Sequence, residues 1–441
     1  MNSIADRRRL VREVLKHPTI TKSVKGFSLA YLYVQLPRVL SVLSRLARRK
    51  HSVKDAFERL QKSLKRGFLP NRFPFFALKL IFGVYFLDTI LTRAPTFRKN
   101  KQLSLFISAF ISGFYNVSHY KYGLQSHPNG PDTSDMTLFL LVRMLDMLVR
   151  IVAAKIRIPR RVMEFGDVAL FTGSCFAIMF AWFYYPHTLP VSYRRWITMA
   201  ANMDDELVET LRLIRNGEIV YGKESKHDNL LHDMCIKYGM DPDVGKFSKT
   251  VPLPCRLVHS NVTDSCEVHA LWRFYRGFYT ALSIYLPINV LMSLISRSWK
   301  KAWRQVLFGS ARSSAFLATF ITLNWYSVCL FRSRIGPKFF PGWSAQQLED
   351  TYGPGLGSLT CGLSSLVEFP KRRGELALFV APRALSTILP PIDQYKDNRR
   401  AFRIECLIFA LSFAGLVTGS RFSSPENIRG VFKKLISSVF N

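Results

Sequence analysis

The chain has 441 residues, of which 48% are hydrophobic and 35 are phenylalanine, and its formal net charge is +32. A soluble chain of this length would form two or three domains, but here short basic runs separate long apolar blocks, which argues against a water-soluble globule. No pattern typical of a nucleic-acid-binding module accompanies the charge, so we exclude nucleic acid as a partner. We expect the basic loops to lie against anionic lipid headgroups, where each Lys or Arg contributes about 1 kcal/mol.

The apolar blocks predict an all-α, polytopic membrane protein. Spanning about 30 Å of hydrocarbon takes roughly 20 helical residues. A basic tail over residues 1–25 precedes ten segments of about this length. In chain order they are 26–43, 73–91, 103–122, 136–153, 166–185, 274–295, 314–331, 355–369, 375–389 and 404–419. The last three are short for a full crossing, so we expect them to tilt little or to be partly re-entrant.

Five segments precede and five follow a long polar stretch, which divides the chain into two membrane repeats. The first repeat covers residues 26–185 and the second covers 271–419. The polar connecting region 186–270 is expected to be water-soluble, partly helical near 203–214, and open to a protein partner. The tail 420–441 predicts a short amphipathic helix that rests on the membrane surface.

Two short signatures recur about half a chain apart, which is typical of a duplicated membrane protein. A Leu-Pro pair precedes an apolar run that ends in Ser-Arg, first at 36–37 and again at 286–287. Because each repeat has an odd number of segments, the repeats are inverted in topology if every segment crosses. The second signature joins Leu138, Phe139, Arg143 and Leu145 with Leu378, Phe379, Arg383 and Leu385.

Charged side chains inside the expected segments are candidate functional residues, because burying charge in lipid is costly. We select six such residues. Three of them share one face of the fourth segment, a fourth takes the equivalent place in the second repeat, and the last two lie on opposite faces of the second segment. One interpretation is an anion or headgroup site at the interface of the repeats, for a lipid or metabolite substrate. The favoured interpretation is a structural ion-pair network. The residues are Arg143, Asp146 and Arg150, then Arg383, then Lys79 and Asp88.

A glycine-rich run in the second repeat predicts close helix packing, because small residues let backbones approach each other. A pore lining is the alternative interpretation. The glycines are Gly353, Gly355, Gly357 and Gly362.

The end of the connecting region contains a C-x3-H-x6-C-x2-H pattern, which offers the ligand types that zinc prefers, at a spacing unlike the usual zinc fingers. A structured juxtamembrane loop without metal is the favoured alternative. A disulfide between the two cysteines is a third option, if the loop faces an oxidising lumen. The ligands would be Cys255, His259, Cys266 and His269, with His232 and Cys235 as nearby alternatives.

His259 and Asp264 also fit the H-x4-D pattern of membrane-bound glycerolipid acyltransferases, in which the His is the general base for an acceptor hydroxyl. The pattern has only two letters, and no phosphate-binding block of the kind those enzymes need follows it. We therefore expect no catalytic residues.

Several motifs together resemble the transmembrane protein 135 family, and they cover residues 180–390 well and the first half loosely. One follows the fifth segment, one contains the Cys/His pattern, and the others lie in the second repeat. They are Tyr184-Tyr185-Pro186-His187-Thr188-Leu189-Pro190 with Ser192-Tyr193, Cys255-x3-His259 with Cys266-x2-His269, Gly362-Leu363-Ser364 with Glu368, Arg372-Arg373-x-Glu375-Leu376-Ala377-Leu378, and Pro382-Arg383-Ala384-Leu385.

The resemblance implies a multi-pass protein of mitochondria and peroxisomes that acts in membrane dynamics and in fatty-acid or sterol handling. The family has no established catalytic activity to carry over. The second half also looks like the wider superfamily of mitochondrial inner-membrane translocase subunits and a small peroxisomal membrane protein. We expect a non-enzymatic organelle membrane protein, with an acyltransferase or a translocase-like subunit as alternatives.

Overall fold

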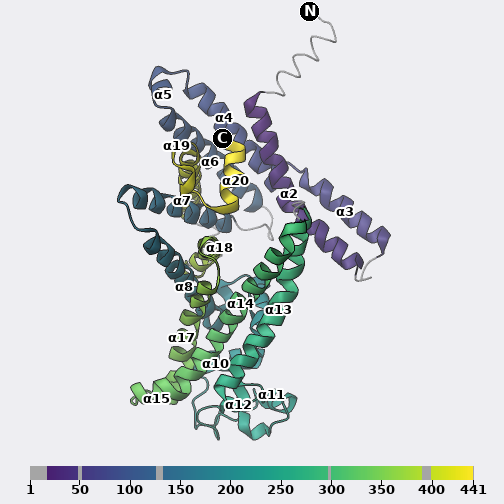
Figure 1. Cartoon of the computed structure of the whole chain (residues 1–441), viewed down its shortest axis with the longest axis vertical. Coiled ribbons are helices and arrows are strands. Elements are labelled where there is room, and N and C mark those ends of the chain that lie inside the picture. Colours follow the sequence, from purple (N-terminus) through teal and green to yellow (C-terminus); the bar gives the residue numbers. More distant parts are fainter. Residues whose placement is uncertain (1–16, 48–51, 126–132, 296–298, 390–398, 441) are drawn as a thin grey trace, which may run out of the picture. The chain divides into compact units, whose positions relative to one another are not determined.

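A computed structural model describes residues 17–47, 52–125, 133–295, 299–389 and 399–440 (Figure 1). Within these ranges all regular secondary structure is helical, which confirms the all-α fold. Residues 1–16 of the expected N-terminal tail lie outside the described residues, and the rest of the tail enters α2 (Pro18–Ala47).

Four stretches of helix are long and apolar enough to cross a membrane, which indicates a membrane protein. They are α4 (Phe73–Leu91), α8 (Arg160–Tyr184), the stretch Trp303–Phe339 and α19 (Arg399–Phe422). The third stretch continues from α14 (Trp299–Leu330) through the π-helical turn η3 (Phe331–Ile335) into α15 (Gly336–Phe339). Helix α4 has the bounds that its apolar run predicts, and Pro74 in its first turn favours a helix start there.

The other expected segments are helical too, although they are not among these four. Segment 355–369 is divided between a short α-helix and a 3-10 helix, so it does not form one continuous α-helix. The elements are α2, α6 (Lys101–Gln125), α7 (Ser134–Lys155), α13 (Cys266–Ile295), α17 (Gly353–Thr360) with η5 (Cys361–Val367), and α18 (Pro370–Ile388).

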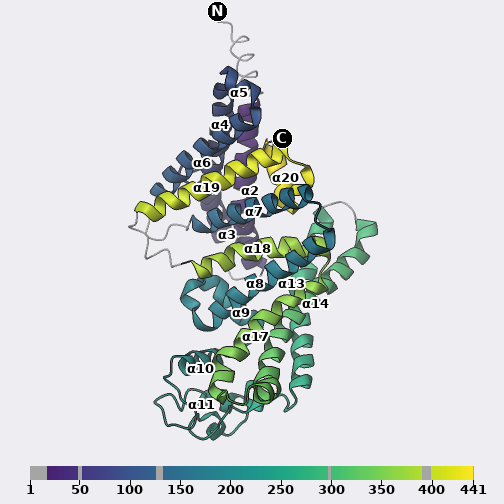
Figure 2. The ribbon, with the colours of Figure 1, turned by 90° about the vertical axis from the view of Figure 1, so that its left-hand side faces the viewer.

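The helices group into two compact units. Unit 1 contains residues 1–157 and 392–441, and unit 2 contains residues 158–391. In unit 1, α2 packs on α4, α4 packs on α6, and α19 packs on α6 and α7 (Figure 2). Its remaining helices are α3 (Val53–Gly67), α5 (Pro95–Lys99) and α20 (Gly430–Phe440).

Unit 2 repeats this order of contacts. Helix α13 packs on α14, α14 packs on α17 and η5, and α8 packs on α17, η5 and α18. Each unit therefore contains the first four segments of one expected repeat and the fifth segment of the other. Helix α8 belongs to the first expected repeat but lies in unit 2, and α19 belongs to the second repeat but lies in unit 1. Because of this exchange of α8 and α19, the units do not coincide with the repeats.

The C-terminal helix α20 packs inside unit 1. Val439 and Phe440 are buried, and the Tyr85 hydroxyl of α4 donates a hydrogen bond of 2.7 Å to the Val439 carbonyl. The Phe440 ring meets the Phe413 ring of α19 edge to face. The apolar face that the sequence assigns to the membrane surface is therefore buried against α4 and α19, because aromatic side chains of these helices cover it.

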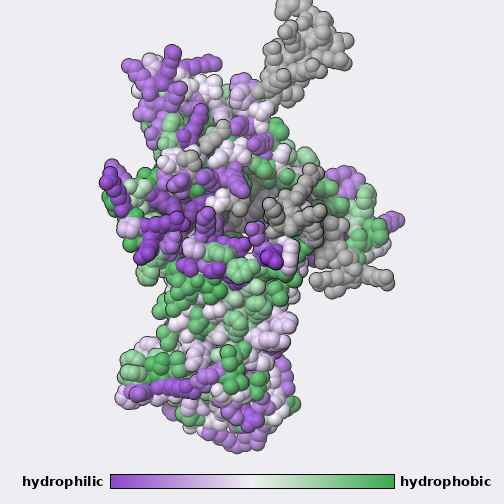
Figure 3. Space-filling view, in the orientation of Figure 1, coloured by the Kyte–Doolittle hydropathy of each residue, from purple (hydrophilic) through white to green (hydrophobic). Residues whose placement is uncertain are grey.

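The connecting region forms short helices that share an apolar core with α14. Its buried Leu231, Phe247 and Leu257 pack with Ile321 and Trp325 of α14. In Figure 3, hydrophobic side chains form a green band over α8, α13 and α14, whereas hydrophilic ones are frequent at the end of unit 2 that contains α11 and α12. The helices are α9 (Val191–Ala201), α10 (Asp205–Arg215), α11 (His232–Lys237) and α12 (Cys255–Val258), with 3-10 turns η1 (Pro186–Thr188) and η2 (Pro242–Gly245).

Candidate metal centre and buried charges

The charged face of α7 pairs with a residue that the sequence analysis did not identify. Asp146 accepts hydrogen bonds from Arg429, including one of 3.1 Å from Nε, and lies 3.4 Å from Arg150 Nε. Arg429 directly precedes α20, 283 positions away in the chain. No local spacing links these residues, so only the packing of the C-terminal segment on α7 reveals the pair.

Arg143 lies beside aromatic rings. Its guanidinium carbon is 5.4 Å from the centre of the Phe139 ring and 5.7 Å from that of Phe432, and the side chain is buried. In unit 2, Arg383 lies 5.8 Å from the ring centre of Tyr193. Both arginines thus make cation–π contacts within their own unit.

Lys79 and Asp88 of α4 differ in their surroundings. Lys79 is exposed, whereas the Ser104 hydroxyl of α6 donates a hydrogen bond of 2.7 Å to Asp88. Asp88 therefore has the partner on another helix that its place on α4 requires.

The four glycines have different roles. A Cβ at Gly357 would lie 2.7 Å from the Asn324 carbonyl of α14, and one at Gly362 would lie 2.4 Å from Thr172 Cα of α8, so both permit close helix packing. A Cβ at Gly355 would meet no atom within 4 Å, so the packing interpretation is wrong for this residue. A Cβ at Gly353 would lie closest to the Leu348 carbonyl, five residues earlier, as described below.

Cysteine and histidine side chains from three elements meet at the start of α13. Atoms of Cys255, His259 and Cys266 that can bind a metal lie within 4.8 Å of one another. Cys255 begins α12, His259 follows that helix, and Cys266 begins α13. Cys329 Sγ of α14 lies 3.5 Å from His259 Nε2, so a third thiol joins the cluster. The sequence analysis missed Cys329, since a cysteine in an apolar run resembles a small hydrophobic residue.

The ring of His259 is held in one orientation. Its Nδ1 lies 2.9 Å from the Thr263 carbonyl oxygen, which can only accept a hydrogen bond. Nδ1 therefore carries the proton, and the lone pair of Nε2 is directed at the thiols. The side chain is 0% exposed, so water does not compete for this nitrogen.

His269, the fourth ligand that the sequence suggests, is engaged elsewhere. Its Nε2 accepts a hydrogen bond of 3.1 Å from Arg273 Nε. Burial, together with the positive charge of Arg273, lowers the pKa of His269 to about 3, which keeps the ring neutral. Arg273 also donates to the carbonyls of Ala201 and Asn202, where α9 ends. His269 therefore supports a buried arginine that caps α9.

The thiol environment distinguishes Cys266 from Cys255. A hydrogen bond that Cys329 donates lowers the pKa of Cys266 to about 5, although burial opposes the shift. The N-terminus of α13 adds its partial positive charge at the same place. Burial raises the pKa of Cys255. The surroundings therefore favour the thiolate form at Cys266 and disfavour it at Cys255.

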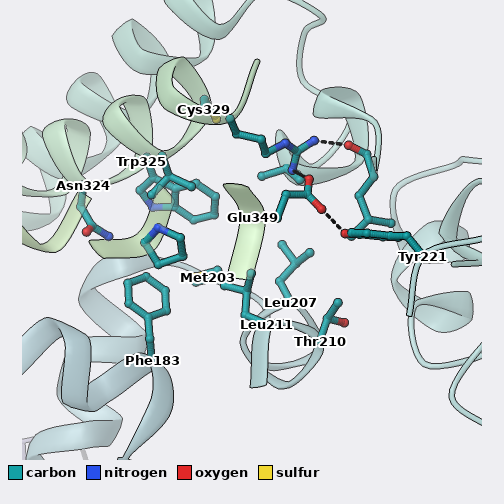
Figure 4. A pocket seen from close by; sticks show the side chains of 15 residues that line it. Phe183, Met203, Leu207, Thr210, Leu211, Tyr221, Asn324, Trp325, Cys329 and Glu349 are labelled. Atoms are coloured by element: carbon teal, nitrogen blue, oxygen red, sulfur yellow. Dashed lines mark hydrogen bonds and ion pairs between the residues drawn. The ribbon is translucent and has the colours of Figure 1, made fainter. Parts of the chain in front are cut away.

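A small cavity adjoins the cluster (Figure 4). It has a volume of about 60 Å³, and Leu207, Trp325 and Cys329 contribute to its mainly apolar lining. Pockets for small molecules usually measure about 300–1,000 Å³, so this cavity is too small for an acyl chain or a sterol.

A buried ion pair closes one side of this cavity. Arg332 Nη1 lies 2.8 Å from Glu349 Oε1, and the Tyr221 hydroxyl donates to the other oxygen of Glu349 (Figure 4). Arg332 also donates to the Leu253 carbonyl. Burial raises the pKa of the Glu349 carboxyl, whereas Arg332 and Tyr221 oppose this shift.

Two π-helical turns position the ion pair. Arg332 lies in η3 and Glu349 lies in η4 (Leu348–Tyr352). A Gly-Pro pair directly follows each turn. Gly336 donates its N–H to the Phe331 carbonyl, and Gly353 donates its N–H to the Leu348 carbonyl. A Cβ at either glycine would lie within 2.8 Å of that carbonyl oxygen. The proline that follows has no N–H, so the α-helical ladder is interrupted there.

The geometry does not assemble the acyltransferase dyad. Asp264 is 78% exposed and lies 3.7 Å from Arg256, whereas His259 is buried and directs Nδ1 at a backbone carbonyl. A general base must reach its substrate hydroxyl, which a buried His259 does not.

Comparison with known proteins gives no match. No known protein family, no curated protein and no solved structure matches the chain significantly. The family resemblance noted from the motifs therefore stays a prediction.

Proposed function

We propose that this chain is a non-enzymatic, duplicated polytopic protein of mitochondrial or peroxisomal membranes, which moves or organises a lipid such as a fatty acid or a sterol. The lipid class and the organelles come from the resemblance to the transmembrane protein 135 family. The membrane setting is supported by the four helices that are long and apolar enough to cross.

The exchange of α8 and α19 is the observation that carries the proposal. Each of these helices is the fifth segment of its repeat, and each packs on the third and fourth segments of the other repeat. In both contacts a glycine lets the two helices approach closely: Gly113 of α6 approaches Ala410 of α19, and Gly362 of η5 approaches Thr172 of α8. Internal repeats occur in many polytopic transport proteins.

Large apolar side chains on the outer faces of the helices support a lipid environment. Helix α13 exposes large apolar side chains along its length, of which Tyr275, Tyr279 and Ile288 are each more than half exposed. So many exposed apolar side chains would be unfavourable in water, but they suit contact with lipid tails. In the proposed arrangement, α13 is therefore the first crossing of the second repeat.

Basic residues of unit 1 support contact with anionic headgroups. Helix α3 exposes Val53 and Phe57 beside several lysines, a pattern typical of helices that lie in the membrane interface. A groove of about 380 Å³ next to it is lined by Arg38, Arg45 and Arg59. A phosphate headgroup would offset this cluster of positive charge.

Localisation and reconstitution together test the proposal. A tagged full-length chain should reside in mitochondria or peroxisomes and resist extraction by alkaline carbonate. In vesicles that contain the purified chain, a fluorescent fatty acid or sterol should cross faster than in empty vesicles. Residence in the plasma membrane, or wild-type vesicles as slow as empty ones, would overturn it.

Arg143→Ala and Arg383→Ala, at equivalent places in the two repeats, should reduce this flux while the protein still inserts. Arg160→Ala is the matched control, because Arg160 is 79% exposed and, within the described part of the chain, pairs with its neighbour Glu164. Equal flux in all three variants would remove the arginines from the transport path.

A further inference from the structure

Four side chains that can bind a metal converge where the connecting region meets the end of α14. Three are thiols and one is an imidazole with its lone pair directed inward. We propose that Cys255, His259, Cys266 and Cys329 bind a structural zinc ion, which fastens the connecting region to the membrane-length helix α14.

The distances suit a tetrahedral site. Zinc binds sulfur at about 2.3 Å and nitrogen at about 2.0 Å, so the N–S edge of a tetrahedron is about 3.5 Å. His259 Nε2 and Cys329 Sγ are 3.5 Å apart. The atoms of Cys255, His259 and Cys266 lie within 4.8 Å of one another, so small movements of the thiols would complete the tetrahedron.

The surroundings of His259 are those of a zinc ligand. Metal-binding histidines usually donate their second ring N–H to a carbonyl or carboxylate, which fixes the tautomer and the ring plane. Here Nδ1 makes this hydrogen bond with the Thr263 carbonyl, within the same short loop that holds Cys266. The loop thus fixes Nε2 for coordination.

A guanidinium that the site shares with Glu349 lies beside the proposed zinc ligands. Three thiolates and one neutral imidazole around Zn²⁺ leave one negative charge, which would be costly in a buried place. Arg332 Nη2 lies 3.9 Å from Cys255 Sγ and supplies a positive charge next to the cluster. Three of the four ligands are buried, and four protein ligands leave no open position, so the site is structural rather than catalytic.

His269 is outside the proposed ligand set because Arg273 occupies its Nε2. This separates the proposal from the one that the sequence pattern suggests. Replacing Cys329 should release zinc, and replacing His269 should not.

The test uses the full-length chain, purified in detergent without chelators. Elemental analysis should find one zinc per chain, and alkylation under denaturing conditions should find all seven cysteines as free thiols. Cys266→Ser and Cys329→Ser should lose the zinc. Cys235→Ser and His269→Gln should keep it; Cys235 is a matched control because it is buried in the same region.

A cobalt measurement on the wild-type chain covers the case in which a cysteine variant fails to fold. Exchange of zinc for Co²⁺ should give the visible absorption of a tetrahedral site and thiolate bands of an intensity that matches three cysteines. The proposal is overturned if the wild-type chain contains no zinc and gives no tetrahedral cobalt spectrum. A disulfide between Cys255 and Cys266 would also overturn it, as would zinc that is retained in Cys329→Ser but lost in His269→Gln.

Discussion

Arg332 and Glu349 form an ion pair of 2.8 Å in the interior of unit 2, and each of them lies in its own π-helical turn. Their side chains are 9% and 3% exposed, so neither charge is solvated by bulk water. The pair joins the end of α14 to the segment that precedes α17, and Arg332 also reaches the connecting region through the Leu253 carbonyl. Three parts of the chain therefore depend on one guanidinium.

Glu349→Gln should destabilise the protein strongly. The substitution leaves the Arg332 charge buried without its carboxylate, and loss of one partner of such a pair costs about 3–5 kcal/mol. Thermal unfolding in detergent would measure the effect. Glu218→Gln is the control, because Glu218 is 41% exposed and lies 3.7 Å from Lys226, and exposed pairs contribute about 0–1 kcal/mol. Equal unfolding midpoints for the two variants would contradict the role of the buried pair.

Gly353→Ala should disturb the ion pair from a distance. The new Cβ would lie 2.8 Å from the Leu348 carbonyl, so the π-helical turn that holds Glu349 must open. We expect a lower unfolding midpoint, by a free energy of about 1–3 kcal/mol. Gly342→Ala serves as the comparison, because a Cβ at Gly342 meets nothing within 4 Å. An unchanged midpoint for Gly353→Ala would show that the turn accommodates a side chain.

Gly362→Ala and Gly355→Ala should have opposite effects, although both residues belong to the same glycine-rich run. A Cβ at Gly362 would collide with the backbone of Thr172, which cannot move without shifting α8, so the cost should be about 1–3 kcal/mol. Gly355 lies in α17 with open space around it, and alanine there should stabilise the helix by about 0.5–1 kcal/mol. Unfolding midpoints of the two variants decide the matter, and destabilisation by both would contradict the assigned contacts.

Asp146→Asn should loosen the C-terminal segment of unit 1. The substitution removes the charge that pairs with Arg429 and Arg150, where hydrogen bonds to a charged group contribute about 1.5–3 kcal/mol. Amide hydrogen exchange over 428–440 should accelerate, because Arg429 directly precedes α20. Glu426→Gln, at an exposed position next to the same helix, should leave the exchange unchanged. Equal exchange in Asp146→Asn and the wild type would mean that α20 is held by its apolar contacts alone.

The sequence by itself determined the features that depend on neighbouring residues. The apolar run 73–91 gave α4 with its bounds, since helix formation and hydrophobic length are local properties. The pattern around Cys255 and Cys266 also identified three of the four residues in the cluster. No local sequence pattern predicted the small cavity or the partners of the buried charges.

Only the tertiary structure decided which distant segments meet. Cys329 reaches His259 across 70 positions, and Arg429 reaches Asp146 across 283. The exchange of α8 and α19 between the two units is likewise invisible in periodicity, because an apolar helix face fits many partners. The choice among partners follows from close approaches such as that of Gly362 to Thr172, which depend on shape in three dimensions rather than on order along the chain.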